Sequence, residues 1–188
     1  MSQIIILVTN DKNLEDKEMS LFIMEQFKKI IKTKYDYVLY KNDYNNSKFE
    51  LGALKDVYKD FDYDELFVLQ DSIEIKDITV FDKIFEEHKG RSVFCNPKGQ
   101  MYLNKYRKEG LDKLEISVPT NKKESIQYEH EFNDKYKKLD TPIILFPDFV
   151  DTDKKEIRFG RNNMIIENEY FKKYKGCWDE KMIKDDKN

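Results

Sequence analysis

Leu66-Phe67-Val68-Leu69-Gln70-Asp71-Ser72 is the stretch of sequence that decides the fold. Its four consecutive apolar residues indicate a strand buried on both faces, and the polar triplet after them indicates that the strand ends in a loop. Residues 4–8, IIILV, show the same pattern and end in Thr9-Asn10-Asp11. Two such strands are typical of a mostly parallel sheet that is covered on both faces.

Helical periodicity separates these strands. Apolar residues recur three and four positions apart between residues 14 and 32 and again between residues 50 and 61, with a β-rich stretch at residues 37–40. This order predicts an α/β fold, with a mostly parallel central sheet and helices on both faces. Ligands of such sheets bind beyond the carboxyl ends of the strands. We therefore expect the loops at residues 9–11, 41–50 and 70–72 to converge around Asp71.

The second half of the chain is less regular. A short helix is expected over residues 80–88, a strand over residues 92–95, one or two surface helices over residues 99–140 and a strand over residues 143–146. Phe159-Gly160-Arg161 is interpreted as a glycine-containing loop before a helix. The 188 residues include no linker rich in Pro, Gly and Ser, so we expect one domain, 1–188.

The composition argues against several classes of protein. The 34 Lys and Arg nearly balance the 37 Asp and Glu, so charge gives no general argument for a nucleic-acid or membrane partner. No apolar run reaches membrane length and no signal-peptide pattern is present, so we expect a cytoplasmic protein. There is no Walker A or GxGxxG pattern. The abundance of Lys, Asn, Asp, Tyr and Ile is typical of an AT-rich genome, such as that of a phage acting in its host cytoplasm.

Asp71 carries the main chemical hypothesis. Its strand delivers the carboxylate to the edge of the sheet, beside Ser72 and before Glu74. A carboxylate there can hold a divalent cation, Mn²⁺ or Mg²⁺, which neutralises a diphosphate. The alternative is that Asp71 only caps the turn after the strand. Gly52-Ala53, near a helix start, either lets backbone approach a ligand or packs that helix tightly on the sheet.

Together these segments resemble the nucleotide-sugar-binding half of a GT-A glycosyltransferase of the family-2-like group. The resemblance covers residues 3–97, and residues 98–188 would form the acceptor-side half and the C-terminal segment. It rests on the strand ending at Thr9-Asn10, on Glu50-Leu51-Gly52-Ala53, and on Gln70-Asp71-Ser72 at the place of the family's Asp-x-Asp motif. The sequence departs from that motif because the second acid is missing.

The resemblance implies a role for each matching residue. Thr9 and Asn10 would lie near the base and ribose, and Asp71 would face the metal and the diphosphate. The other implied nucleotide contacts are Glu50, Gly52, Ala53, Gln70 and Ser72. The implied activity is transfer of a sugar from a nucleotide-diphosphate donor, such as a UDP-sugar, to a hydroxyl acceptor. Modified DNA, a glycan and a protein are all compatible acceptors.

Four residues of the second half are further candidates. An inverting transferase needs a base that takes the acceptor proton; Asp148 is the first candidate and Asp151 the second, with a solvated acidic loop as the alternative. Arg161 either pairs with phosphate or is an ordinary surface arginine. Trp178 either stacks on an acceptor or, as we expect, anchors the C-terminal segment.

Two other readings of the sequence stay open. The missing second acid favours a non-catalytic module that keeps the fold and binds a nucleotide or a partner. A doubly wound domain of another class is also compatible, because fold does not fix function. The sequence leaves undecided the donor, the acceptor, the stereochemical outcome, metal binding and the oligomeric state.

Overall fold

The computed structural model describes residues 1–44, 49–98 and 100–176. Trp178 and Cys177 lie outside these residues, and so does the charged tail that follows them. The described elements, in chain order, are β1 (Gln3–Asn10), α1 (Asp11–Glu15), α2 (Lys17–Ile31), β2 (Asp36–Asn42), α3 (Phe49–Asp60), β3 (Glu65–Gln70), β4 (Ile73–Ile75), α4 (Val80–Asp82), the π-helix η1 (Lys83–Glu87), β5 (Val93–Phe94), β6 (Leu103–Arg107), α5 (Lys108–Leu111), α6 (Lys122–Leu139), β7 (Ile143–Ile144), β8 (Lys155–Arg158), β9 (Arg161–Glu167) and β10 (Phe171–Gly176).

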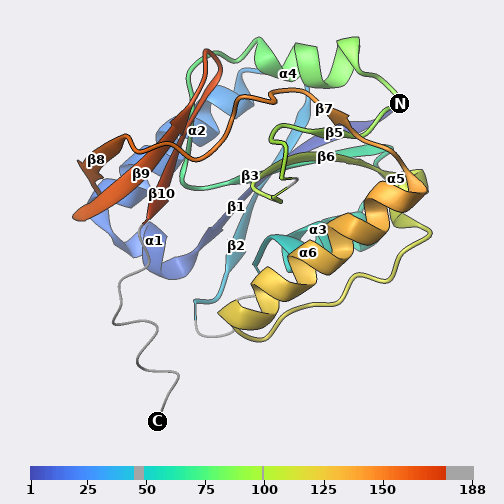
Figure 1. Ribbon diagram of the computed structural model, residues 1–188, viewed down its shortest axis with the longest axis horizontal. Coiled ribbons are helices and arrows are strands. Elements are labelled where there is room, and N and C mark those ends of the chain that lie inside the picture. The colour runs from blue at the N-terminus through green and yellow to red at the C-terminus, as the bar shows by residue number, and fades with distance from the viewer. Residues whose placement is uncertain (45–48, 99, 177–188) are drawn as a thin grey trace.

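A six-stranded sheet forms the centre of the molecule, in the order β2-β1-β3-β6-β5-β7 (Figure 1). β1 pairs in parallel with β2 and β3, and β5 pairs in parallel with β7. β6 is antiparallel to both of its neighbours, so five strands run one way and one runs the other way. The predicted α/β class with a mostly parallel sheet is confirmed.

One or two surface helices joined by loops were predicted over residues 99–140; two helices form there, but the prediction missed a strand. Residues 103–107 form β6, which lies inside the sheet between β3 and β5, and only α5 and α6 are helical in this region. The strand was hidden because it buries polar side chains, Asn104 and Lys105, which are both fully buried. Burial of polar residues removes the hydrophobic pattern from which a central strand is predicted.

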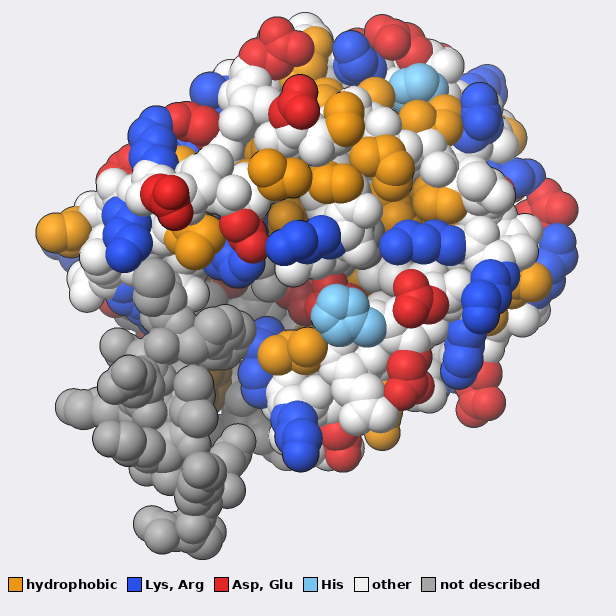
Figure 2. Space-filling view, in the orientation of Figure 1, with side chains coloured by type: hydrophobic (Ala, Val, Ile, Leu, Met, Phe, Trp, Pro, Cys, Tyr) orange, Lys and Arg blue, Asp and Glu red, His pale blue; other side chains and the backbone are white. Residues whose placement is uncertain are grey.

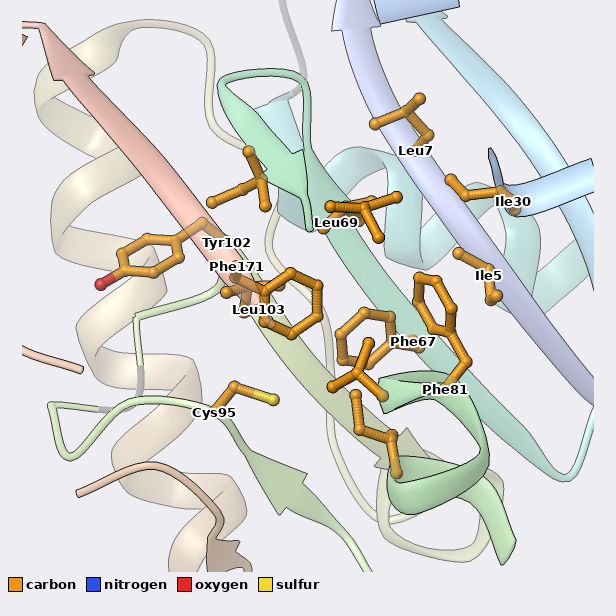
Figure 3. Packing of buried hydrophobic residues seen from close by; sticks show 14 of the residues in the cluster. Ile5, Leu7, Ile30, Phe67, Leu69, Phe81, Cys95, Tyr102, Leu103 and Phe171 are labelled. Carbon is orange, nitrogen blue, oxygen red and sulfur yellow. The ribbon is translucent and has the colours of Figure 1, made fainter. Parts of the chain in front are cut away.

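Side chains of β1 and β3 alternate between two cores, as strand geometry requires. Ile5 and Phe67 face the helices α2 and α4, whereas Ile6 and Val68 face α3 and α6. Helices therefore cover both faces of the sheet, as predicted (Figure 1). Figure 3 shows the first core, where the ring of Phe67 meets that of Phe81 with a centroid distance of 5.9 Å.

A second sheet, in the order β4-β10-β9-β8, stands beside α2 (Figure 1). All its pairs are antiparallel. β4 begins two residues after Asp71, so the turn at Asp71 and Ser72 joins the central sheet to the second sheet. The predicted helix after Phe159-Gly160-Arg161 is wrong, because this segment is the turn between β8 and β9. Gly160 has a φ of 66° there, a conformation that glycine adopts without a steric cost.

The predicted helix over residues 14–32 is divided. Asp16 ends α1 and caps α2, because its side chain accepts a hydrogen bond from the Met19 amide at 2.8 Å.

Acidic and basic side chains are mixed over the face in Figure 2, around a group of hydrophobic side chains. None of the helices in the described residues is long and apolar enough to cross a membrane.

Candidate functional site

The chain changes direction in the sheet between β1 and β3. From β1 it passes through α2 to β2 on one side, and from β2 it passes through α3 to β3 on the other side of β1. Connections that diverge in this way leave a crevice at the carboxyl ends of the two strands, where α/β proteins bind ligands. Val8 is paired with Gln70, so Thr9 and Asp71 meet at this edge of the sheet.

Asp71 is held firmly at this point. Its amide donates to the Val8 carbonyl at 3.0 Å, and its Oδ2 accepts hydrogen bonds from Thr9 Oγ1 and Asn13 Nδ2, both at 2.8 Å. The side chain is buried, with 8% of its surface exposed. Burial raises the pKa of Asp71, although the hydrogen bonds from Asn13 and Thr9 oppose the rise. The hydrogen bonds from Thr9 and Asn13, together with the backbone bond to Val8, hold the Asp71 carboxylate in a defined orientation.

Gln70 connects an acid to a lysine beside Asp71. Its Nε2 donates to Glu50 Oε1 at 2.5 Å, and its Oε1 accepts hydrogen bonds from Lys173 Nζ and from Ser72 Oγ. Lys173 Nζ also donates to Ser72 Oγ at 2.8 Å. Glu50 comes from the first turn of α3, so three separate segments meet at the carboxyl end of β3.

Lys173 reaches the site from the second sheet. Its partner in register is Ile73, and Tyr174 donates a backbone hydrogen bond to Ser72, which places β10 directly against the turn after Asp71. The ammonium lies 4.6 Å from the centre of the Tyr102 ring. Burial lowers the pKa of Lys173 to about 8, while the charges of Glu50 and Asp71 oppose that change.

The predicted nucleotide contacts divide into two groups. Thr9, Glu50, Gln70, Asp71 and Ser72 do come together. Asn10 instead caps α1, because its Oδ1 accepts a hydrogen bond from the Asn13 amide.

Gly52 and Ala53 are buried on α3, and Ala53 belongs to the core against the sheet. Helix-to-sheet packing therefore accounts for Ala53. The predicted role of Gly52 and Ala53 at the nucleotide stays a prediction, as does that of Asn10.

The predicted catalytic acids lie in the segment after β7. Asp151 accepts hydrogen bonds from Lys98 at 3.2 Å and from Lys175 at 2.9 Å. Burial alone raises the pKa of Asp151, but the two lysines outweigh that effect and lower it. Asp148 is exposed, and it precedes Phe149, whose ring packs against Tyr102.

Arg161 is not brought to the cluster. It is exposed at the turn between β8 and β9, five residues along β9 from Ile166, which faces Lys173. At the rise of a β-strand this spacing corresponds to roughly 16 Å. A direct contact between Arg161 and a ligand at Asp71 would therefore need a ligand that extends along β9.

The donor set around Asp71 does not fit a divalent cation in this arrangement. Such a cation takes several oxygen ligands at once, and the described residues contain no group of three His, Cys, Asp or Glu side chains that could hold one. Asp71 Oδ2 already accepts two hydrogen bonds, and the Lys173 ammonium interacts with the charges of both Glu50 and Asp71. The predicted Mn²⁺ or Mg²⁺ at Asp71 stays a prediction.

Sequence reasoning missed Lys173 and Asn13. In Phe171-Lys172-Lys173-Tyr174 a period of two places Lys173 on the same face as the buried Phe171, and this is the one available signal. It is weak, because three of the five residues 171–175 are lysines. Asn13 had no signal of its own, since it reaches Asp71 only because Asn10 starts a helical turn.

Two hollows of about 260 Å³ each lie away from this cluster. One is lined by residues that follow α2 and by residues at the start of α4, including Tyr35 and Asp82, and the other lies between α3 and residues 114–116.

Comparisons with protein-family models, with curated proteins and with solved structures found no match to this chain. The functional argument therefore rests on the cluster around Asp71.

Proposed function

We propose that this chain is a GT-A-like glycosyltransferase that moves a sugar from a nucleotide-diphosphate donor to a hydroxyl acceptor. One observation carries the proposal: a buried cluster of polar and charged side chains at the carboxyl ends of β1 and β3, where the chain changes direction in the sheet. Asp71, Glu50 and Gln70 offer hydrogen-bond acceptors and a donor to sugar hydroxyls, and Lys173 offers a positive charge.

The reaction needs three events at one place. The acceptor hydroxyl attacks the anomeric carbon, a base takes the hydroxyl proton, and the bond from that carbon to the nucleoside diphosphate breaks. Asp71 would orient the donor, because Thr9 and Asn13 hold its carboxylate in place. A preorganised group of this kind avoids the cost of ordering during the reaction.

Asp148 is the first candidate for the base. Asp151 is a weaker one, because its two lysine partners lower its pKa and reduce its tendency to accept a proton. Asp148 adjoins Phe149, and the ring of Phe149 packs on Tyr102, which covers Lys173. We expect Asp148→Asn to reduce transfer while nucleotide affinity stays within about twofold, because the change spares the donor contacts.

The proposal is tested by thermal shift with UDP, GDP, UDP-glucose and related donors, each with and without manganese. A ligand at 100 times its dissociation constant adds about 2.7 kcal/mol to the free energy of unfolding. We expect one nucleotide class to raise the melting temperature of wild type and not that of Asp71→Ala. If a well-folded wild type is stabilised by no donor, the transferase proposal is contradicted.

A non-catalytic nucleotide- or partner-binding module is the alternative. It is favoured by the single acid in Gln70-Asp71-Ser72, where the resembled family has two. Slow hydrolysis of the donor separates the two proposals, since a transferase usually releases some nucleoside diphosphate when water replaces the acceptor. Binding without release of the nucleoside diphosphate, with or without manganese and with acceptors present, would favour the module.

A further inference from the structure

We propose that Lys173 is the anion-binding residue of this site and that its ammonium receives the diphosphate of the donor at the place where a divalent cation was expected. This inference rests on the proposed function. It also assigns to the site a residue of the second sheet, which the resemblance to GT-A enzymes does not include.

The first step is the surroundings of the ammonium. Lys173 has 5% of its surface exposed, and its Nζ donates to Gln70 and Ser72, two neutral side chains. Among the described residues no ion pair of Nζ with a carboxylate is found, although Glu50 and Asp71 are near enough to affect its pKa. A buried lysine without a direct counter-ion is costly, which is why buried charges in proteins are generally paired.

The second step is position. Gln70 and Ser72 flank Asp71, so the ammonium is held by the two neighbours of the residue at which the resemblance places metal and diphosphate. An anionic ligand at the carboxyl ends of β1 and β3 would supply a direct counter-ion. The ammonium also lies over the ring of Tyr102, 4.6 Å from its centre.

The third step is charge balance. The Lys173 ammonium interacts with the charges of Glu50 and Asp71 and offsets part of them, so the site attracts a divalent ion less strongly than two carboxylates alone would. The same lysine attracts a diphosphate, and a charge-assisted hydrogen bond from an ammonium to phosphate is among the stronger polar interactions in proteins. Binding of the donor should therefore not require added metal.

The experiment measures binding of UDP, GDP and inorganic pyrophosphate by calorimetry, in EDTA and in manganese. The wild type is compared with Lys173→Met and with Lys172→Met. Lys172 is the matched control, since it lies next to Lys173 on the opposite face of β10 and is paired with Glu156. We expect one nucleoside diphosphate to bind wild type and Lys172→Met equally in both buffers, and Lys173→Met to bind it at least about tenfold more weakly.

The outcomes distinguish this inference from the proposed function. Binding of a nucleotide to wild type only in manganese, or undiminished binding by a folded Lys173→Met, overturns the role of Lys173 and leaves the transferase proposal intact. Binding of pyrophosphate through Lys173 without binding of any nucleotide supports the anion site and contradicts the transferase. If neither binds, both are overturned. The comparison of the two buffers uses wild type alone, so it decides the metal question even if Lys173→Met does not fold.

Discussion

Two buried lysines lie at opposite ends of β3 and have opposite surroundings. At the amino end, Lys105 Nζ donates to Glu65 at 3.1 Å and to the His88 carbonyl at 2.9 Å, and both side chains of the ion pair are almost completely buried. At the carboxyl end, the partners to which Lys173 donates within the described residues are the neutral groups of Gln70 and Ser72. The first lysine forms an ion pair within the protein, whereas the second forms none among the described residues and, in our proposal, receives an anionic ligand.

The difference separates a structural charge from a functional one. Glu65 also accepts hydrogen bonds from the Gly90 amide and from Gln3. The buried polar groups at the amino end are therefore hydrogen-bonded to one another. Burial lowers the pKa of Lys105, and Glu65 opposes that change by direct contact. At the carboxyl end the acids affect Lys173 only from a distance. Four experiments test this difference between the two ends of β3.

The largest effect is expected at the amino end. Glu65→Gln leaves Lys105 buried without a counter-ion, so the free energy of unfolding should fall by about 3–5 kcal/mol. Urea unfolding measures this loss. The double variant Glu65→Gln, Lys105→Met should recover part of it, because the unpaired charge is then gone. A loss below about 1 kcal/mol in the single variant would show that the ion pair between Glu65 and Lys105 contributes little to the free energy of unfolding.

The second effect depends on pH and concerns Lys173. Its pKa is about 8 in the folded protein against an ordinary lysine value of 10.5, so between these values the unfolded chain binds more protons. The free energy of unfolding of wild type should therefore rise with pH relative to Lys173→Met, by about 2 kcal/mol between about pH 7 and about pH 9.5. Comparison of the two proteins removes the contribution of the tyrosines, which titrate in both.

At about pH 7 Lys173→Met should be at least as stable as wild type, because removing a buried charge without a counter-ion relieves its desolvation. Urea unfolding at several pH values measures both effects. A difference between the two proteins that does not change with pH would show that Lys173 keeps an ordinary pKa and is not a strained charge.

The third effect concerns the orientation of Asp71. Thr9→Val removes the hydroxyl that donates to Asp71 Oδ2 and should lower the free energy of unfolding by about 1 kcal/mol, since Asn13 still donates to the same oxygen. Nucleotide affinity should fall as well, and thermal shift measures that fall. Thr9→Ser keeps the hydroxyl and should behave as wild type. If the Val and Ser variants have the same free energy of unfolding and the same nucleotide affinity, the Thr9 hydroxyl has no role at the site.

The smallest effect is expected at the surface. Glu25→Gln removes an exposed partner of Lys29 on α2 and should change the free energy of unfolding by less than about 0.5 kcal/mol, because water screens such pairs. Thermal unfolding measures the change. The contrast with Glu65→Gln would show that burial, and not ion pairing as such, makes the amino end sensitive. A loss of several kcal/mol here would contradict that explanation.

Local patterns predicted the first half of the fold well. The apolar runs before Thr9 and Asp71 form β1 and β3, and the periodicity around Leu54 forms α3. These elements bury continuous apolar faces, which is the property that the patterns detect. β6 and β10 were missed because Lys105 and Lys173 are buried polar residues, and a pattern cannot show that a lysine has a partner far away in the chain.

The site was predicted in part for the same reason. Thr9, Gln70 and Asp71 follow apolar strands, and their meeting follows from the parallel pairing of β1 and β3. Lys173 meets them only because the turn at Asp71 starts β4 and β4 pairs with β10. That pairing joins residues about a hundred positions apart, and no spacing within the sequence indicates it.

Hydrogen exchange with and without UDP-glucose and GDP tests the central claim most directly, because it reports on both ends of β3 in one experiment. The account predicts that one of these ligands protects amides at residues 9–13, 70–73 and 171–175 and leaves residues 65, 88–91 and 105 unchanged. Protection confined to the amino end or to the hollow near Tyr35 and Asp82, or protection nowhere, would contradict the assignment of the carboxyl end as the binding site.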